Sequence, residues 1–274
     1  VSDPVRTAEY QQRWDNEGTG FAAAYLDIGT DEKANETAAE FVRTKIRETV
    51  SDPKTADLLS PTNAIACKRL CMDTNYYETY NRDNVSLIDI NETPIVGLVE
   101  DGVQTSEDVF KFDVVVFAIG FDAMTGALLA IDIRGKHGIS LREKWTDGPG
   151  AYLGLSSEGF PNLFMITGPG SPSVLSNMMT SIEQHVEWIN DCVEFMETNG
   201  KTEIDADISA ENRWMDHVAE VADATLRYSC NSWYLGANVP GKKRIFVPYA
   251  GGLPKYIEKC DEETDAGYPG FNIT

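Results

Sequence analysis

The first 60 residues carry apolar positions at helical spacing. From Ala34 to Val50, apolar residues recur every three or four positions and so share one helical face, and Asp31 precedes them as a capping residue. Pro53 ends this helix and suits the first turn of a shorter one that reaches Leu59. Since we find no strand pattern in this segment, we predict a helical start to the chain.

From about residue 65 the spacing of apolar residues shortens toward that of strands. Residues 76–80 predict one helical turn, and residues 85–90 alternate weakly as a strand. Residues 94–105 predict a hairpin around an Asp-Gly turn. Residues 112–118 form an apolar, β-branched run, which is typical of a strand buried on both faces.

The remaining chain alternates predicted strands with predicted helices. This alternation places the chain in the α/β class, with the helical start as a separate or inserted subdomain. The predicted strands span residues 151–155, 162–167 and 244–249. The first predicted helix ends at Asn199, and the others span Glu211 to Arg227 and Lys255 to Ala266. The first carries its apolar side on Ile182, His185, Val186, Ile189, Val193 and Met196.

Length and charge narrow the class of protein. The 274 residues suffice for one large domain or parts of two, with a sizeable core. The net charge of −21 argues against binding to nucleic acids or anionic membranes, because their phosphates would be repelled. The longest apolar runs, residues 114–119 and 127–131, are too short to cross a bilayer. We therefore expect a globular protein with no nucleic-acid or membrane partner.

Cysteine and histidine usage bears on location and metal binding. The five cysteines are scattered and form no Cys-x-x-Cys pair, which suits a reducing cytosol, so we expect a cytoplasmic protein. His137, His185 and His217 lie far apart, so we expect no metal site. The chain begins with Val1 rather than Met, and its opening is typical of the middle of a longer sequence.

One glycine-rich stretch imitates a dinucleotide-binding loop. Gly18 and Gly20 open a match to the loose pattern GxGxx(G/A). The functional motif follows a strand and opens a helix, whereas no strand pattern precedes Gly18. Because no other stretch fits the pattern, we predict that the chain lacks a Rossmann fingerprint of its own.

Lys68 and Arg69 are adjacent cations in a mostly apolar stretch of an acidic protein. One interpretation is a surface pair that forms salt bridges. The other is recognition of an anion, because an arginine stays charged at physiological pH and can hold a phosphate or a developing oxyanion.

Two predicted strand ends carry polar residues. Gly120 and Asp122 end the apolar run, either as an ordinary turn or as part of a ligand site at the carboxyl end of a sheet. Residues 167–179 connect a strand to a long helix, and Ser176 or Asn177 can cap that helix. The free N–H groups of a helix start favour an electronegative ligand atom, although the stretch also fits a plain connecting loop.

Trp233 stands in a loop rich in glycine and proline. It can serve as a packed anchor. Alternatively, it can offer an aromatic surface to a ribose or a ring, with its N–H as a donor.

Seven stretches, in order, resemble the C-terminal half of Baeyer–Villiger monooxygenases, flavin enzymes that insert oxygen beside a ketone carbonyl. The resemblance covers essentially the whole chain and is closest to the phenylacetone and steroid monooxygenase branch. One departure is Ile119, where the family more often has Thr. The stretches are residues 67–69, 76–82, 117–128, 160–164, 168–173, 181–188 and 232–242.

The resemblance implies an α/β fold made of the C-terminal parts of two Rossmann-like domains, for FAD and NADPH, with a helical insertion. Residues 1–64 would end the helical insertion, residues 65–117 would complete the NADPH-binding domain, and residues 118–274 would complete the FAD-binding domain. Both glycine-rich dinucleotide loops would precede Val1. We therefore expect the chain to be the second half of a longer enzyme.

The resemblance also assigns roles to the two adjacent cations. Arg69 matches the catalytic arginine of the family, which lies close to the cofactors. A fixed guanidinium stabilises negative charge developing on oxygen, an effect worth on the order of 3 kcal/mol per donor. Lys68 matches a residue near the 2′-phosphate of NADP, where a point cation suits a dianion. The carboxylate that partners this arginine in the family would precede Val1.

Further positions match residues around the cofactors and the substrate. Met178 matches a residue against the flavin, and Trp233 matches a residue of a mobile loop that touches the nicotinamide cofactor. We assign Asp122, at its strand end, to cofactor binding. The predicted substrate pocket comprises Ser173, Val174 and Leu175.

The implied function is an FAD- and NADPH-dependent conversion of ketones to esters or lactones with O2, by an enzyme that is a monomer when complete. The chain alone would be inactive, because it needs the preceding half of the same enzyme. Two alternatives stay open: a related flavin-dependent N- or S-oxygenase, and a non-catalytic α/β remnant that binds a partner through its acidic surface. The Lys68–Arg69 pair and the Trp233 loop favour ketone oxidation over the first alternative, and retention of flavin would exclude the second.

Overall fold

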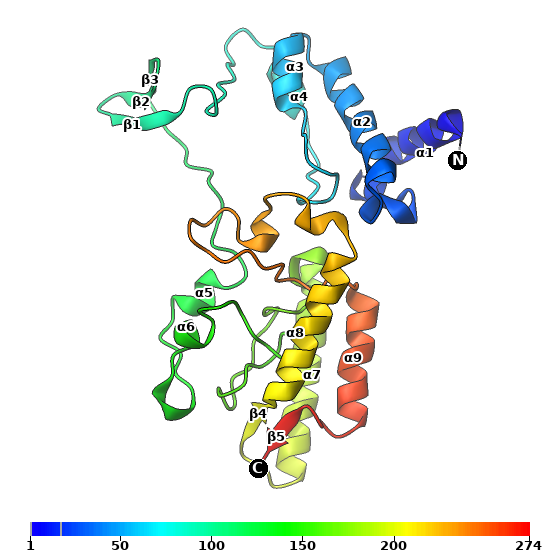
Figure 1. The fold of residues 1–274 in the computed structure, drawn as a ribbon, viewed down its shortest axis with the longest axis vertical. Helices are drawn as coiled ribbons and strands as arrows, with labels where there is room; N and C mark the ends of the chain where they lie inside the picture. The colour runs from blue at the N-terminus through cyan, green and yellow to red at the C-terminus, as the bar shows by residue number, and fades with distance from the viewer. Residues whose placement is uncertain (1, 17) are drawn as a thin grey trace. The chain divides into compact units, whose positions relative to one another are not determined.

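The computed structural model describes residues 2–16 and 18–274 and divides into two compact units, Val1–Gly120 and Phe121–Thr274 (Figure 1). The boundary lies at the end of the apolar run that contains residues 112–118. The assignment of residues 1–64, 65–117 and 118–274 to separate functional domains stays a prediction.

The first unit begins with helices, as the sequence predicts. Asp31 caps α2 by accepting a hydrogen bond from the Ala34 N–H at 2.8 Å, and Asp52 caps α3 through the Thr55 N–H at 2.8 Å. These contacts confirm both predicted helix starts. The helices are α1 (Asp3–Asn16), α2 (Glu32–Thr49), α3 (Pro53–Leu59) and α4 (Tyr76–Thr79), with 3₁₀ helices η1 (Gly18–Ala23) and η2 (Leu26–Gly29).

An aromatic cluster forms the core of these helices. The ring of Tyr10 lies 5.3 Å from that of Phe21 and 5.6 Å from that of Phe41, between centroids. Ile28 and Ala38 are buried against the same cluster. Packing of α1 and α2 thus fixes the 3₁₀ helices between them. Because α1 precedes Gly18, the absence of a strand before the glycine-rich stretch is confirmed.

A small antiparallel sheet follows, in the order β1 (Ile95–Val99), β2 (Gly102–Thr105) and β3 (Val109–Lys111). Its first two strands confirm the predicted hairpin. Val99 pairs with Gly102, so the turn is Glu100–Asp101, one residue before the predicted Asp-Gly turn. Gly102 is required there, since a Cβ would lie 1.8 Å from the carbonyl oxygen of Phe110.

Two strand predictions in the first unit are wrong. Residues 85–90 and 112–118 form no strand, and the side chains of Val114 and Val116 are 76% and 80% exposed. A strand buried on both faces needs paired neighbours and covering layers. None of the strands in the described part of the chain pairs with either segment. Apolar composition alone is therefore not enough for these segments to form strands.

The second unit consists of three long helices, several short helices and a two-stranded antiparallel sheet (Figure 1). β4 and β5 pair with Asp205 opposite Asn272. The helices are α5 (Gly126–Leu129), α6 (Leu141–Lys144), α7 (Met178–Thr198), α8 (Ile208–Asp223) and α9 (Leu253–Asp265), with 3₁₀ helices η3 (Lys136–Gly138), η4 (Ser173–Leu175), η5 (Leu226–Tyr228) and η6 (Trp233–Leu235); the strands are β4 (Ile204–Ala206) and β5 (Phe271–Ile273).

α7, α8 and α9 enclose the largest core. Trp188 of α7 donates a hydrogen bond to the carbonyl oxygen of Cys260 at 3.2 Å, and Trp214 and Tyr256 lie in the same buried cluster. The three predicted helices are confirmed, although the second spans Ile208–Asp223 rather than Glu211–Arg227. The predicted inner face of α7 is partly wrong. Its Val186 and Val193 are exposed, while Ser181, His185, Trp188, Cys192 and Met196 are buried.

Three strand predictions in the second unit are also wrong: residues 151–155, 162–167 and 244–249 are irregular. Leu153, Asn162 and Thr167 have φ angles of 55°, 59° and 54°, a left-handed conformation that a strand cannot contain. Their buried apolar neighbours gave these stretches the composition of strands. Residues 151–155 instead form a buried turn, which is closed by a hydrogen bond from the Tyr152 N–H to the Ser156 carbonyl oxygen.

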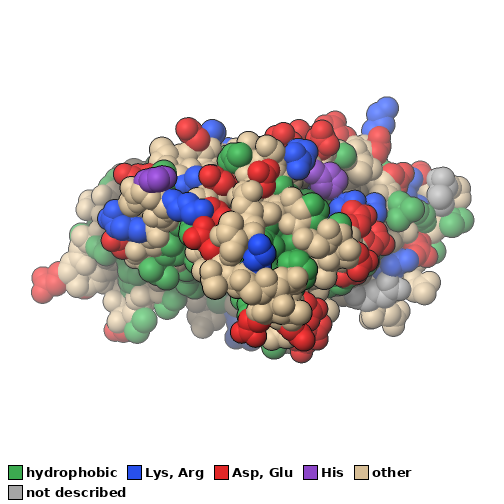
Figure 2. Space-filling view, turned by 90° about the horizontal axis from the view of Figure 1, so that it is seen from below, with side chains coloured by type: hydrophobic (Ala, Val, Ile, Leu, Met, Phe, Trp, Pro, Cys, Tyr) green, Lys and Arg blue, Asp and Glu red, His purple; other side chains and the backbone are tan. Residues whose placement is uncertain are grey.

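The fold is thus mixed α/β, as predicted at the level of class. Both sheets are antiparallel, and the residues described include no parallel strand pair, so neither unit shows a Rossmann sheet by itself. Within the same residues, no helix is long and apolar enough to cross a membrane. On the face in Figure 2, Asp and Glu side chains are interspersed with Lys and Arg rather than gathered in one patch.

Candidate functional site

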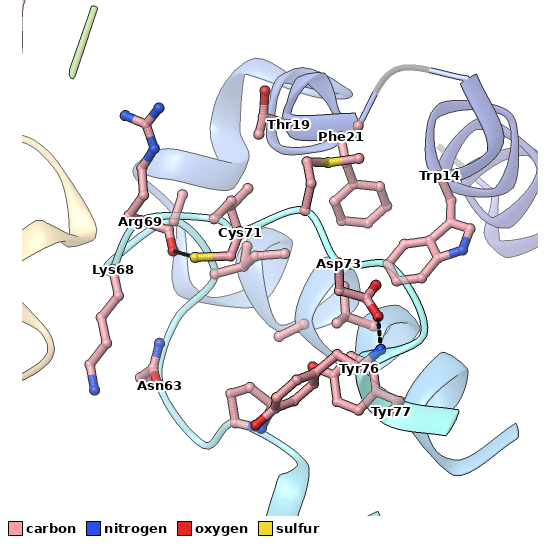
Figure 3. A pocket seen from close by; sticks show the side chains of 18 of the residues that line it. Trp14, Thr19, Phe21, Asn63, Lys68, Arg69, Cys71, Asp73, Tyr76 and Tyr77 are labelled. Atoms are coloured by element: carbon pink, nitrogen blue, oxygen red, sulfur yellow. Dashed lines mark hydrogen bonds between the residues drawn. The ribbon is translucent and has the colours of Figure 1, made fainter. Parts of the chain in front are cut away.

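A cavity of about 760 Å³ lies in the first unit, and both predicted cations line it. Figure 3 shows Lys68 and Arg69 on one side of this cavity and Trp14, Tyr76 and Tyr77 on the other. The cavity therefore has a cationic edge and an aromatic wall. Phe21 and Met72 extend the apolar lining.

Asn35 of α2 fixes the segment that carries the two cations. Its side-chain amide is buried, donates to the carbonyl oxygens of Ile28 and Ile65 at 2.7 and 3.1 Å, and accepts from the Ile65 N–H at 2.9 Å. Ala66 then turns the chain with a φ of 61°. This anchor leaves Lys68 and Arg69 exposed immediately afterwards.

Tyr77 in the aromatic wall of the cavity is uncharged near neutral pH, because burial raises its pKa above the ordinary value of a tyrosine. Asp73 accepts a hydrogen bond from the Tyr76 N–H at 2.9 Å. Lys68 and Arg69 therefore supply the positive charge of the cavity, which suits an anionic or electron-rich ligand.

In the second unit, three predicted residues lie in the segment before α7, and a fourth, Met178, begins that helix. Asn177 caps α7 by accepting from the Met179 N–H at 3.1 Å, which settles the choice between Ser176 and Asn177. Met178 is the first residue of α7 and is partly exposed. Ser173 is buried, with its hydroxyl 3.9 Å from the sulfur of Met124.

Val174, Leu175 and Trp233 meet in one hydrophobic cluster. They pack against the buried residues Tyr234, Leu235 and Phe246. The rings of Trp233 and Tyr234 lie 4.3 Å apart between centroids. The structure thus brings together two of the predicted substrate-pocket residues and the predicted cofactor contact, although they lie about 60 positions apart in sequence.

Asp122 forms an ion pair with Lys242, a partner that sequence reasoning missed. Lys242 also donates to the hydroxyl of Thr125 at 2.8 Å, and Asn238 donates to the carbonyl oxygen of Phe121 at 2.8 Å. These contacts tie the loop after Trp233 to the Asp122 segment. The available signal was the lysine pair that ends this glycine- and proline-rich stretch.

A second cavity, of about 320 Å³, lies beside this ion pair, and both Asp122 and Lys242 line it. The two cavities belong to different units: Lys68 and Arg69 line the first, and Asp122 lines the second. Across residues 2–16 and 18–274, no three His, Cys, Asp or Glu side chains gather as metal ligands.

Each unit has residues that suit part of a dinucleotide ligand. In the first unit, Lys68 and Arg69 suit phosphates or a developing negative charge. In the second unit, the start of α7 presents backbone N–H groups. The described chain offers no glycine-rich loop between a strand and a helix, because Gly18 follows α1. It can therefore supply only one side of such a site.

Curated proteins and solved structures match the chain along its length, whereas no protein-family model matches it. A Baeyer–Villiger monooxygenase of Pseudooceanicola batsensis is 38% identical over 278 residues, which cover 97% of this chain and 50% of that protein. Cyclohexanone 1,2-monooxygenase of Acinetobacter sp is also 38% identical, over 100% of this chain and 50% of its own length. The chain spans about half the length of the curated relatives it matches.

Solved structures agree. Oxidized steroid monooxygenase bound to NADP superimposes with a TM-score of 0.92 at 45% identity, over 100% of this chain and 51% of that one. A closed structure of cyclohexanone monooxygenase gives a TM-score of 0.96 at 42% identity, over 100% of this chain and 52% of that one. The higher identity with the steroid enzyme agrees with the predicted branch.

The fold and the whole-chain similarity place the chain among flavin-dependent monooxygenases. Within that class it belongs to the Baeyer–Villiger monooxygenase family, and it corresponds to the C-terminal part of those proteins.

Proposed function

We propose that the chain is the C-terminal half of an FAD- and NADPH-dependent Baeyer–Villiger monooxygenase that converts ketones to esters or lactones with O2. The main support is the superposition of the entire chain on half of steroid monooxygenase at 45% identity. The cationic edge of the first cavity, formed by Lys68 and Arg69, supports the same proposal.

Arg69 is the proposed catalytic residue. When bound, the flavin supplies activated oxygen from O2, and NADPH supplies the reducing equivalents. The guanidinium of Arg69 stabilises the negative charge that develops on oxygen during insertion, and it does so at any physiological pH. Its place at the cavity edge, next to the Asn35-anchored segment, suits this role.

The remaining cofactor and substrate roles follow from the same proposal. Lys68 binds the 2′-phosphate of NADP, Met178 contacts the flavin, and Trp233 contacts the nicotinamide. Asp122, which is held by its ion pair with Lys242, contributes to cofactor binding. Val174 and Leu175 shape the ketone pocket beside Trp233, with Ser173 supporting them from its buried position.

The missing half of the enzyme is the proposed partner of this chain. Residues 1–64 then end a helical insertion, residues 65–117 complete the NADPH-binding domain, and residues 118–274 complete the FAD-binding domain. The complete enzyme is a monomer in the cytoplasm. We expect the 274 residues alone to be colourless and inactive. Turnover of a ketone by these residues alone would contradict the proposal that they need the other half of the enzyme.

N-oxygenation is the second candidate reaction. Phenazine N-monooxygenase PhzNO1 of Lysobacter antibioticus is 40% identical over 99% of this chain and 50% of its own length. The two reactions would share the flavin chemistry and differ in whether a ketone or a nitrogen atom receives the oxygen. The product therefore distinguishes them.

Labelling with isotopic oxygen distinguishes the two reactions. The complete enzyme is supplied with NADPH, ¹⁸O₂ and either a ketone or a phenazine, and the products are analysed by mass spectrometry. We expect one ¹⁸O atom in an ester or lactone. An N-oxide from the phenazine with no ester from any ketone would establish the second candidate instead. Failure of the complete enzyme to retain flavin would favour the non-catalytic remnant.

A further inference from the structure

The loop of residues 167–173 holds a strained backbone next to the proposed ketone pocket. Thr167 and Ser173, at its two ends, have φ angles of 54° and 44°. A β-branched residue such as threonine rarely adopts this left-handed conformation, and such strain persists only where the surroundings enforce it. Ser173 begins η4, which contains Val174 and Leu175.

His185 of α7 contacts the first residue of this loop. Its imidazole is fully buried, and its Nδ1 accepts a hydrogen bond from the Thr167 N–H at 2.9 Å. Its Nε2 lies 2.9 Å from the hydroxyl oxygen of Tyr256 on α9. Tyr256 in turn donates to the carbonyl oxygen of Leu153 at 2.6 Å. The imidazole thus links three separate segments of the second unit.

The directions of these hydrogen bonds determine the state of the imidazole. A backbone N–H can only donate, so Nδ1 carries no proton. Tyr256 gives its single hydrogen to Leu153, so Nε2 of His185 is the donor in their contact. His185 is therefore neutral with its proton on Nε2. Protonation of Nδ1 would remove the acceptor and release Thr167.

The rest of the loop is held by backbone contacts and one indole. Gly170 donates to the carbonyl oxygen of Val247 at 2.9 Å, and Trp214 donates to the carbonyl oxygen of Gly170 at 3.2 Å. Tyr249 donates from its N–H to the carbonyl oxygen of Ser171 at 2.8 Å. These contacts fix residues 170–171, whereas His185 fixes the strained entry at Thr167.

We propose that His185 is a positioning residue, which holds Thr167 in its left-handed conformation and, together with the contacts of residues 170–171, sets the course of the loop that leads to Val174 and Leu175. The relevance to ketone binding depends on the proposed function, but the positioning itself does not. A purely structural histidine would fill space in the core, and an apolar residue of similar size would replace it without moving the loop.

The electrostatic surroundings keep His185 neutral at physiological pH. Burial lowers its pKa to about 4. The titratable group that faces it is Tyr256, whose pKa burial raises well above its ordinary value, and Cys260 on the same helix has its pKa raised to about 12 by burial. Both groups are uncharged across the range in which His185 titrates. The loop therefore keeps its anchor until the pH approaches 4.

A matched pair of variants tests the proposal in the 274-residue chain by amide hydrogen exchange. His185→Asn keeps an acceptor close to the position of Nδ1, whereas the nearly isosteric His185→Leu removes it. We expect the exchange rate of the Thr167 amide to rise about tenfold in His185→Leu and to change little in His185→Asn, as loss of one backbone hydrogen bond predicts. Amides of α8 and β4 report unfolding of the second unit as a whole and should not change.

Equal Thr167 exchange in the wild type and in His185→Leu, with the α8 and β4 amides unchanged, would overturn the proposal. If neither variant folds, the unmodified chain still decides it. Nitrogen NMR of the His185 ring should show an unprotonated Nδ1 and a protonated Nε2 at pH 7, and the opposite tautomer would overturn it. No ketone is used in either measurement, so their result is separate from that of the proposed function.

In the complete enzyme, the proposal predicts a specific kinetic pattern. His185→Leu should raise the KM for the ketone several-fold, and His185→Asn should restore it. The rate of flavin reduction by NADPH should be the same in both variants. An equal rise of KM in both variants would assign His185 to general packing and overturn the positioning role.

Discussion

Two buried polar side chains, one in each unit, hold the loops that carry the candidate site residues. Asn35 of α2 binds the backbone of Ile65, just before Lys68 and Arg69. His185 of α7 binds the backbone of Thr167, at the start of the loop that leads to η4. In both units a left-handed residue lies at or next to the anchored position, Ala66 in one and Thr167 in the other.

The two anchors differ in whether they titrate. An asparagine amide keeps the same donors and acceptor at every ordinary pH, whereas an imidazole loses its acceptor when protonated. The cationic segment is therefore held independently of pH, and the loop in the second unit is not. The two anchors thus do the same structural work, but only the histidine makes the conformation of its loop depend on pH.

The largest effect is expected when the first anchor is removed. Asn35→Leu deletes three hydrogen bonds and leaves buried backbone groups of Ile28 and Ile65 unpaired. Each such group costs about 1–3 kcal/mol, so the first unit should lose about 3 kcal/mol or more of its free energy of unfolding. Hydrogen exchange of the α2 amides, recorded at increasing urea concentrations, measures this loss in the first unit. Asn16→Leu, at an exposed position of α1, should change stability by less than about 0.5 kcal/mol.

Acid should weaken the second anchor next. The pKa of His185 is lowered by burial to about 4, from about 6.5 in an unfolded chain. The unfolded state therefore takes up its proton first as the pH falls. The titration of His185 leaves stability unchanged above pH 6.5, and the free energy of unfolding then falls as the pH drops, by about 3 kcal/mol at pH 4. Comparing wild type with His185→Asn between pH 7 and pH 4 isolates it, because parallel curves would exclude His185 as the source.

A smaller effect is expected at the loop after Trp233. Lys242→Met breaks the ion pair with Asp122 and the hydrogen bond to Thr125. Because both charged groups are partly exposed, stability should fall by no more than about 1 kcal/mol. Exchange of amides in residues 236–243 should rise. Lys243→Met is the control, since that side chain is mostly exposed, and an identical response to both changes would remove any special role from Lys242.

Helices with a capping residue and an apolar face could be predicted from the sequence. α2 and α3 begin where Asp31 and Pro53 indicate, and the β1–β2 hairpin lies within the predicted residues with its turn one position earlier. Five strands were predicted wrongly because apolar composition does not supply a neighbouring strand. Residues 112–118 lack a partner, and residues 151–155 and 162–167 contain left-handed residues that sequence reasoning did not detect.

The candidate site was predicted only in part. The resemblance identified Val174, Leu175 and Trp233, which the structure brings into one cluster. It did not identify Asn35, His185 or Lys242, because their partners are backbone groups or distant residues. Such contacts depend on the tertiary fold rather than on local spacing. A buried polar residue on an amphipathic helix is nonetheless a signal worth noting.

We propose that Arg69 serves oxygen insertion rather than cofactor reduction. In the complete enzyme, Arg69→Ala should lower ester formation about 100-fold or more, as removal of one stabilising donor predicts. Lys68→Ala is the matched neighbour and should instead raise the KM for NADPH.

The decisive measurement is the stopped-flow rate of flavin reduction by NADPH in Arg69→Ala, recorded beside ester formation in the same preparation. We predict that flavin reduction continues at close to the wild-type rate while ester formation is lost. An equal loss of both rates would contradict the claim.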